Sequence, residues 1–246
     1  MNLEKFKKSL HKYIDKKRAG KDSLFFKTGV GEYGYGDIFL GITVPNTRKV
    51  VKEYSKELEL KDAVELLSSK YHEERLAGLL LLVSFYKNGN LPAQAGEKEK
   101  KIIFNTYLKN TKKINNWDLV DTSAPNIVGD YLLEKDLSAQ AGRNILYKLA
   151  KSKNLWERRI AIISTFAFIK NKEYEYTFKI CEMLMNDKED LIHKACGWML
   201  REVGKNCGQN ILNKFLDKYA SVMPRTMLRY AIEKHSEKER KKYLIL

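Results

Sequence analysis

The sequence predicts an all-α protein, and three observations support this prediction. Apolar residues recur with the period of an amphipathic helix along most of the 246 residues. The alternation of apolar and polar residues that is typical of a half-buried strand is nearly absent. Similar segments also return at separations of about 35 to 43 residues, which is the size of a two-helix repeat.

Four segments carry the helical pattern most clearly: VVKEYSKELEL, ERLAGLLLLVSFY, RRIAIISTFAFI and KACGWMLREV. Pro45, Pro92 and Pro224 lie at or near expected helix starts, where a fixed φ and a missing N–H cost little. Pro125 differs because APNIVGDYLLE continues a helical pattern through it. We therefore expect a kink or a break at Pro125.

The repeated segments centre near residues 77, 120, 161, 196 and 230. Neither helix of a two-helix unit can bury its apolar stripe alone, so neighbouring units are expected to stack into a curved solenoid with a concave face. Corresponding positions of successive repeats would place cations and aromatic residues on that face: Arg75, Trp117, Arg159, Lys194 and Arg229. The alternative is that these side chains face different directions and do not share one face.

The segment FFKTGVGEYGYGDIFLGITVP, residues 25–45, interrupts the helical pattern. Its glycines permit backbone angles that other residues avoid, and Tyr33 and Tyr35 alternate with them. No Gly-Lys-Ser/Thr follows, and no strand precedes it, so it matches neither a P-loop nor a dinucleotide fingerprint. We expect a connector, whose backbone N–H groups or tyrosines could also contact a phosphate.

The charge of the chain favours a polyanionic partner. Forty-six Lys and Arg against 31 Asp and Glu give a formal net charge of +15. A field of this sign attracts nucleic acid, and a solvated basic surface that only aids solubility is the alternative. No run of about 18 uncharged apolar residues occurs, and the start MNLEKFKKSLHKY mixes charge with apolar residues. We expect no membrane association and a cytoplasmic, nucleoid-associated monomer.

Cysteine and histidine spacing gives no metal motif. Cys181, Cys196 and Cys207 have no CxxC spacing, and the first two fall in helical apolar patterns typical of buried residues. The four histidines are scattered, and YHEERL lacks the second His of an HExxH site. We expect neither a metal nor another cofactor.

The stretch NNWDLVDTS places an indole and a carboxylate four residues apart, at Trp117 and Asp121. In a helix this spacing puts both side chains on one face. WDLVD, LWERRIAI and HKACGWMLRE, together with FFKTGVGEYGYGDIFLGITVPNTRK and SAPNIVGDYLLE, resemble the DNA alkylation repair glycosylases of the AlkD type. The resemblance runs from about residue 24 to about residue 205.

This resemblance implies a solenoid of HEAT-like repeats, here one domain over residues 1–246, and excision of N3- or N7-alkylated purines from duplex DNA. It makes Asp121 the catalytic aspartate and places Trp117 and Trp198 with it in the catalytic set. Arg159 corresponds to the family's phosphate-binding arginine. Further DNA contacts are expected from these residues: Arg158, Arg201, Tyr33, Tyr35 and Lys194.

Structural interpretations stand beside these roles. Either tryptophan could be a core residue, and Asp121 could cap or hydrogen-bond the segment before Pro125, because DTSAP resembles a helix start. Arg158 and Arg159 could be a solvated pair with Glu157 as a local partner.

Three functions remain open at this point. The first is a hydrolytic alkylpurine glycosylase that leaves an abasic site without strand cleavage, since no lysine is marked as a Schiff-base nucleophile. The second is a non-catalytic protein of the same fold that binds distorted or branched DNA, although an acidic side chain facing a polyanion costs affinity. The third is a helical-repeat scaffold for an acidic protein partner.

Overall fold

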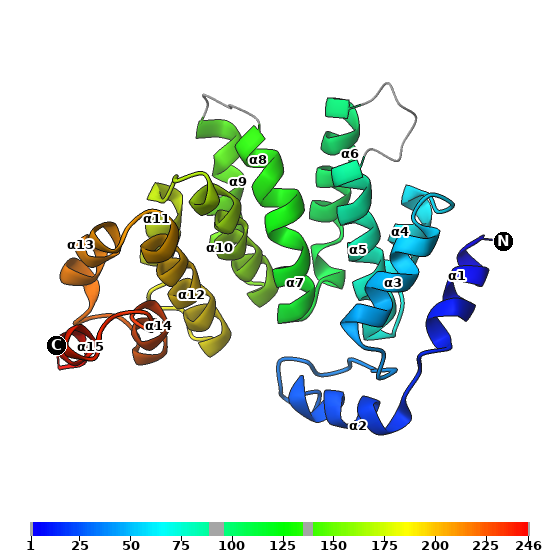
Figure 1. The fold of residues 1–246 in the computed structure, drawn as a ribbon, viewed down its shortest axis with the longest axis horizontal. Helices are drawn as coiled ribbons and strands as arrows, with labels where there is room; N and C mark the ends of the chain where they lie inside the picture. The colour runs from blue at the N-terminus through cyan, green and yellow to red at the C-terminus, as the bar shows by residue number, and fades with distance from the viewer. Residues whose placement is uncertain (1, 89–95, 135–139, 246) are drawn as a thin grey trace. The chain divides into compact units, whose positions relative to one another are not determined.

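The helices of the computed structural model fall into two compact units, residues 1–123 and 124–246 (Figure 1). The structure describes residues 2–88, 96–134 and 140–245, without the side chains of residues 140–143. Nearly all regular structure in these ranges is helical, and an isolated parallel bridge joins Ile38 to Tyr71. The prediction of an all-α protein is confirmed. A single repeat domain with a concave basic face stays a prediction.

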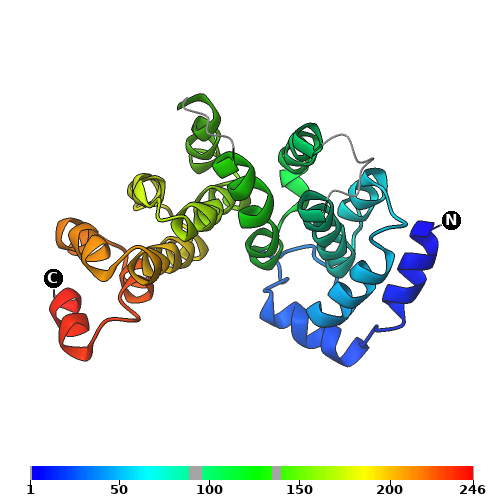
Figure 2. The ribbon, with the colours of Figure 1, turned by 45° about the horizontal axis from the view of Figure 1, so that its top comes forward.

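Unit 1 is built around one buried helix. Its elements are α1 (Asn2–His11), α2 (Lys16–Phe25), α3 (Val44–Tyr54), α4 (Leu60–Leu67), α5 (His72–Asn88), α6 (Gly96–Lys109), η1 (Thr111–Lys113) and α7 (Trp117–Ala124). Helices α3, α4 and α6 pack against α5 (Figure 2). Residues 72–82 of α5 are all buried, which explains why its sequence reads as a nearly continuous apolar run.

The segment VVKEYSKELEL is not one helix. Helix α3 ends at Tyr54, and α4 begins at Leu60. Glu59 and Asp62 form a capping box that starts α4, because each side chain pairs with the backbone N–H of the other residue. The apolar period continues across this turn because both helices bury their apolar side chains in the same core.

The glycine-rich segment after α2 is an ordered connector. At Gly34 a Cβ atom would meet the carbonyl oxygen of Phe26 at 2.2 Å, so only glycine fits there. The buried Glu73 carboxylate of α5 accepts the backbone N–H groups of Leu40, Gly41 and Ile42. These three N–H groups are thus engaged within the protein, contrary to the expectation that this part of the segment could offer them to a phosphate.

Unit 2 contains the remaining elements. They are η2 (Pro125–Gly129), α8 (Asp130–Glu134), α9 (Gln140–Ala150), α10 (Leu155–Lys170), α11 (Glu175–Met183), α12 (Asp190–Asn206), α13 (Gln209–Tyr219), α14 (Arg225–Ala231) and α15 (Glu237–Leu244). Helix α10 packs against η2, α9, α11 and α12, and α12 packs against α13 and α14. Cys181 and Cys196 are fully buried here, as predicted.

Proline positions agree with the expected helix boundaries. Pro125 opens a π-helical turn, η2, because a proline has no N–H to continue the α-helical ladder. Pro45 lies in the first turn of α3, and Pro224 is the N-cap of α14. Pro92 lies outside the described residues. The chain stays helical through η2 into α8, so the predicted break does not occur, and the change at Pro125 is one from α-helical to π-helical hydrogen bonding.

The basic C-terminal segment is partly packed. Helix α15 begins at a capping box of Ser236 and Glu239. Its Tyr243 side chain is buried and donates a hydrogen bond to Asp217 at 3.0 Å. Lys241 and Lys242 remain exposed, so one face of this helix packs while the other carries positive charge to solvent.

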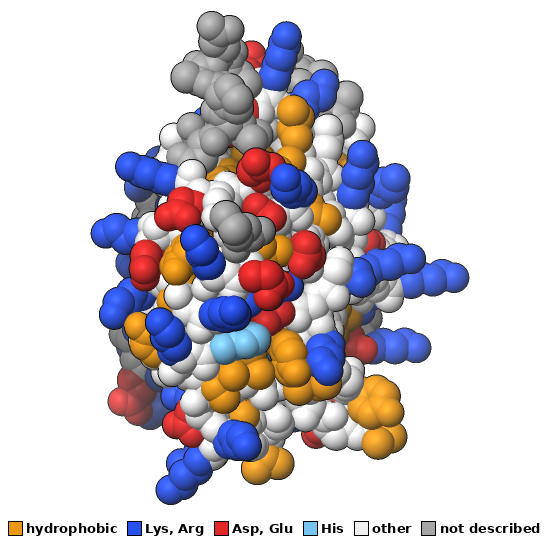
Figure 3. All heavy atoms as spheres, turned by 90° about the vertical axis from the view of Figure 1, so that its right-hand side faces the viewer, with side chains coloured by type: hydrophobic (Ala, Val, Ile, Leu, Met, Phe, Trp, Pro, Cys, Tyr) orange, Lys and Arg blue, Asp and Glu red, His pale blue; other side chains and the backbone are white. Residues whose placement is uncertain are grey.

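The surface at the N-terminal side of unit 1 carries both signs of charge. Figure 3 shows acidic side chains near the middle of this view, basic side chains around them and a group of hydrophobic side chains below. Exposed apolar residues of unit 1 include Leu24 and Phe25 at the end of the basic helix α2, and Val30 after it. None of the helices that the structure describes is long and apolar enough to cross a membrane.

Candidate active site

Helix α7 carries the two candidate catalytic residues of unit 1. Trp117 is its first residue, and Asp121 follows one turn later on the same face. Both side chains are half-buried, whereas Leu119, Val120 and Ala124 are fully buried and anchor the helix in the core. Asp121 lies inside α7 and not at a helix start, so the capping interpretation of DTSAP is wrong.

A buried tyrosine, Tyr107, is affected by the charge of the Asp121 carboxylate. Tyr107 of α6 is fully buried, and its hydroxyl is 3.0 Å from Ser123 Oγ. Burial, together with the negative charge of Asp121, raises the pKa of Tyr107 well above its usual value. Tyr107 therefore stays a neutral hydroxyl beside the candidate carboxylate.

A buried cluster of charged and amide side chains holds the start of α7. At its centre is Asp37, which lies within the glycine-rich segment and is 8% exposed. Arg75 of α5 forms an ion pair with its carboxylate. Asn115 and Asn116 donate to the same carboxylate at 3.0 and 3.1 Å. Asn116 Oδ1 in turn accepts the backbone N–H of Trp117 at 2.9 Å, which fixes the first residue of α7.

His72, the first residue of α5, joins Asp37 to α7. Its Nδ1 lies 3.0 Å from Asp37 Oδ2, and its Nε2 lies 2.8 Å from Asp118 Oδ2. Burial by itself lowers the pKa of His72, but the charges and hydrogen bonds of Asp118 and Asp37 outweigh burial and raise the pKa to about 9. At neutral pH the ring is therefore an imidazolium that donates to both carboxylates.

Aromatic rings pack between this cluster and the candidate tryptophan. The Phe39 ring stacks on His72 at 4.4 Å between centroids, and Phe26 stacks on Phe39 at 4.8 Å. Phe26 also stacks on Trp117 at 5.2 Å with an interplanar angle of 16°. Phe25 meets the indole edge-on at 6.0 Å. One face of the Trp117 ring is thus covered by Phe26, which fixes its plane.

The raised pKa of His72 predicts a pH-dependent stability. Its ordinary pKa of 6.5 applies in the unfolded chain, and the folded pKa is about 9. The stabilisation is therefore complete below pH 6.5 and is lost as the pH rises through 9. Over this window the free energy of unfolding of the wild type, relative to His72→Gln, should fall by on the order of 3 kcal/mol. Urea denaturation between pH 5.5 and 9.5 measures this difference.

His235→Gln is the matched control for that titration. His235 is also buried, but its side-chain partners are Gln209 and Asn213, and burial lowers its pKa. Its variant should follow the wild-type pH dependence between pH 6.5 and 9. If the free energies of unfolding of the wild type and of His72→Gln changed in parallel with pH over this window, His72 would not carry the charge.

The paired arginines predicted to bind DNA lie at the start of α10 in unit 2. Arg159 is 5% exposed, and its Nη1 donates to the carbonyl of Leu191 at 2.6 Å. Arg158 Nε lies 2.6 Å from Asp187 Oδ2, and its Nη1 donates to the carbonyls of Ser152 and Lys153. The interpretation of these arginines as a solvated pair is wrong. Their contact with DNA stays a prediction, and for Arg158 it would require exchange of these partners.

Helix α12 carries Trp198, Arg201 and Lys194. Trp198 is half-buried, its Nε1 donates to Glu202 Oε1 at 3.3 Å, and its ring lies 6.2 Å from that of Phe166. Arg201 forms an ion pair with Glu233. Lys194 lies 2.8 Å from Asp190, one turn earlier on the same helix. Each of these side chains is held by an acid or a ring within unit 2.

Comparison with known proteins decides the family. A family model described as DNA alkylation repair enzyme matches residues 6–235. The chain belongs to the DNA alkylation repair enzyme family. A solved structure of a predicted DNA alkylation repair enzyme from Enterococcus faecalis has the same fold, with a TM-score of 0.69 at 16% identity, and the match covers 91% of this chain and 97% of that one. No curated protein sequence matches.

The remaining predicted positions of this family member are Arg229, which is exposed on α14 of unit 2, and three residues of unit 1. Tyr33 is half-buried, and its hydroxyl lies 3.5 Å from the carbonyl of Phe25. Tyr35 is 64% exposed on the same segment. Arg75, expected on a concave face, is instead buried in its ion pair with Asp37, so that expectation is wrong for this residue.

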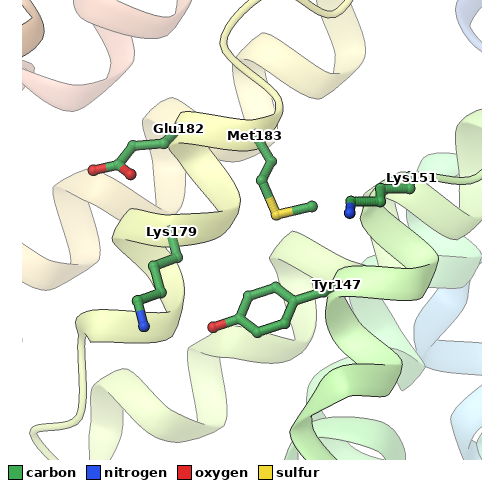
Figure 4. Close-up of a pocket in the computed structure, with 5 residues that line it drawn as sticks. All are labelled: Tyr147, Lys151, Lys179, Glu182 and Met183. Atoms are coloured by element: carbon green, nitrogen blue, oxygen red, sulfur yellow. The ribbon is translucent and has the colours of Figure 1, made fainter.

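A pocket of about 560 Å³ lies on unit 2 between α9 and α11. Figure 4 shows its lining: Tyr147, Lys151, Lys179, Glu182 and Met183. The carboxylate of Glu182 accepts a hydrogen bond from Tyr219, and none of the residues predicted for catalysis lines the pocket. We therefore take α7, and not this pocket, as the candidate catalytic element.

Sequence reasoning missed the residues that hold α7: Asp37, His72 and Asp118. Two of them stand at helix starts, in YHEER and NNWD, where an acid or a histidine has many structural uses. Their spacing along the chain carries no signal, since Asp37 and His72 are separated by 35 residues and His72 and Asp118 by 46. Across the residues that the structure describes, no group of three or more His, Cys, Asp or Glu could hold a metal ion.

Proposed function

We propose that this protein is a DNA glycosylase that removes cationic N3- or N7-alkylated purines from duplex DNA by hydrolysis. The observation that carries the proposal is α7, which holds an indole and a carboxylate one turn apart, with its first turn anchored by buried charges. Membership of the DNA alkylation repair enzyme family supports DNA as the substrate.

The chemistry needs little from the protein beyond a placed negative charge. Alkylation at N3 or N7 makes the purine cationic and weakens its bond to C1′ of the deoxyribose. As that bond breaks, its electron pair leaves with the purine, which becomes neutral, and positive charge builds on the sugar. Asp121 stabilises this charge and orients a water whose oxygen bonds to C1′. The water releases one proton, and the products are the free base and an abasic site.

The tryptophans would bind the cationic lesion. An indole face attracts a cation by roughly 0.5 to 2 kcal/mol, depending on desolvation. Phe26 covers one face of Trp117, and the side chain is only half-buried, so its remaining surface is open to a ligand. Trp198 is half-buried as well and would act in the same way from α12.

Positive charge on both units supports binding to a polyanion. Residues 1–123 contain 23 Lys and Arg against 16 Asp and Glu, and residues 124–246 contain 23 against 15. Each unit is therefore basic by itself, and each would lower the free energy of phosphate binding in a salt-dependent way. Arg159, Arg158, Arg201 and Lys194 of unit 2 and the tyrosines of the loop are the proposed phosphate contacts.

Base release from methylated duplex DNA tests the proposal. We expect the purified protein to release 7-methylguanine or 3-methyladenine, measured by chromatography, and to leave an uncut strand with an abasic site. Duplex binding should weaken steeply with added salt in a gel-shift experiment. Tight duplex binding without base release would contradict the proposal and favour a non-catalytic DNA-binding protein, and lysine-dependent strand cleavage would contradict the hydrolytic mechanism.

A further inference from the structure

His72 occupies a position from which it can control the geometry of α7. The side chain is 1% exposed and has a carboxylate at each ring nitrogen. One carboxylate, Asp37, belongs to the segment after α2, and the other, Asp118, belongs to the first turn of α7. A single ring thus joins three stretches of chain that are far apart in sequence.

Besides the contact through Asp37 and Asn116, two further paths lead from His72 to Trp117. The first passes through Asp118, the residue that follows Trp117 in α7. The second passes through Phe26, whose ring lies 5.2 Å from His72 and 5.2 Å from Trp117. Neither path includes a residue predicted to touch the substrate other than Trp117 itself.

We infer that His72 is a positioning residue for the candidate active site: by binding Asp118 and packing on Phe26, it sets the orientation of Trp117 and of the first turn of α7, which Asp121 follows on the same helix. This inference rests on the proposed function for its kinetic consequence. Its structural part concerns only residues of unit 1 and stands independently of any activity.

The charge balance of the cluster depends on His72. The charged groups that face it are Asp37 from the loop and Asp118 from α7, and Arg75 of its own helix pairs with the other carboxylate oxygen of Asp37. With an imidazolium, two cations balance two carboxylates. Loss of its proton leaves one negative charge in excess within the core, beside Trp117, and such a charge is costly when buried.

Asp118 depends on His72 more than Asp37 does. Asp37 has other hydrogen-bond donors in Arg75, Asn115 and Asn116. By contrast, Asp118 Oδ1 is a buried atom for which the described residues provide no hydrogen-bond partner, so His72 is the donor that the structure gives to this carboxylate. Removing the imidazolium therefore releases the α7 end of the cluster first.

Fluorine NMR of the full-length protein labelled with 5-fluorotryptophan tests this positioning role. The chain has three tryptophans, and a Trp117→Phe sample assigns the Trp117 resonance. We expect that resonance to titrate with a midpoint near pH 9 in the wild type, and the resonance of Trp156, which lies in unit 2, to stay in place. His72→Gln should abolish the titration, and the matched buried-histidine variant His235→Gln should retain it.

Single-turnover kinetics supplies the second readout. His72→Gln should slow base release by about 10- to 100-fold through misplacement of the reacting groups, with little change in the Kd for duplex DNA. If His72→Gln only destabilised the fold, less of the protein would be folded, and base release and DNA binding would fall together. A Trp117 resonance that does not respond near pH 9 in the wild type overturns the inference without any variant having to fold.

The two proposals fail in different ways. If the wild type releases no base while the Trp117 resonance titrates as described, the glycosylase proposal is wrong and the positioning of Trp117 by His72 is retained. If the wild type releases base and the Trp117 resonance and the rate of His72→Gln are both unchanged, the positioning role is wrong and the glycosylase proposal is retained.

Discussion

Asp121→Asn is expected to reduce release of alkylated purine by at least ~100-fold, while duplex binding remains intact. The substitution keeps the size of the side chain but removes its negative charge. An amide neither stabilises a developing oxocarbenium nor accepts a proton from the attacking water. Because phosphate repels a carboxylate, binding to DNA should be unchanged or slightly tighter. Chromatographic base release and a gel shift on the same preparations measure both quantities.

Asp130→Asn is the matched control for this substitution. Asp130 is the first residue of α8 and is half-buried, as Asp121 is. Its variant should retain the wild-type rate of release. Equal losses in both variants would indicate a general effect of removing negative charge. Retained activity in Asp121→Asn would move the proposed chemistry to another carboxylate.

The sequence predicted the elements that depend on local pattern. Helical period alone identified α5, α10 and α12, because each buries apolar residues along most of its length. The spacing of Trp117 and Asp121 predicted one shared helical face, and the structure has both on α7. Pro125 predicted an interruption because its missing N–H acts within a single turn, whatever the rest of the fold does.

Partners that lie far apart in sequence could not be predicted. Arg75 and Arg158 both stand in helical segments with solvent-exposed charge as the simplest interpretation, but Asp37 and Asp187 neutralise them in the folded protein. A lone acid in a glycine-rich loop gives no sign that it will be buried. The cluster at Asp37 arises from tertiary packing, and the pattern of a single sequence carries no record of which acid meets which base.

The largest loss of stability is expected from a substitution in the buried cluster around Asp37. Asp37→Ala leaves the Arg75 guanidinium and the His72 imidazolium in the core without their shared carboxylate, and it frees the amides of Asn115 and Asn116. Removing one partner of a buried ion pair costs about 3 to 5 kcal/mol. We expect the free energy of unfolding to fall by this amount, measured by urea denaturation followed by circular dichroism. The surface-pair variant Asp22→Ala, which loses the contact with Arg18, should change it by less than about 1 kcal/mol.

A second substitution separates charge from packing in this cluster. If the cost of Asp37→Ala comes from uncompensated buried charge, adding Arg75→Met should recover part of the stability, because the double variant no longer buries a guanidinium without a counter-ion. His72 keeps Asp118 as its partner in that variant, so the imidazolium stays paired. If the losses of stability caused by Asp37→Ala and by Arg75→Met simply add, the Asp37 carboxylate acts chiefly as a hydrogen-bond acceptor for Asn115 and Asn116. In that case the orientation of Trp117 depends on the amide of Asn116, which binds its backbone N–H, more than on charge.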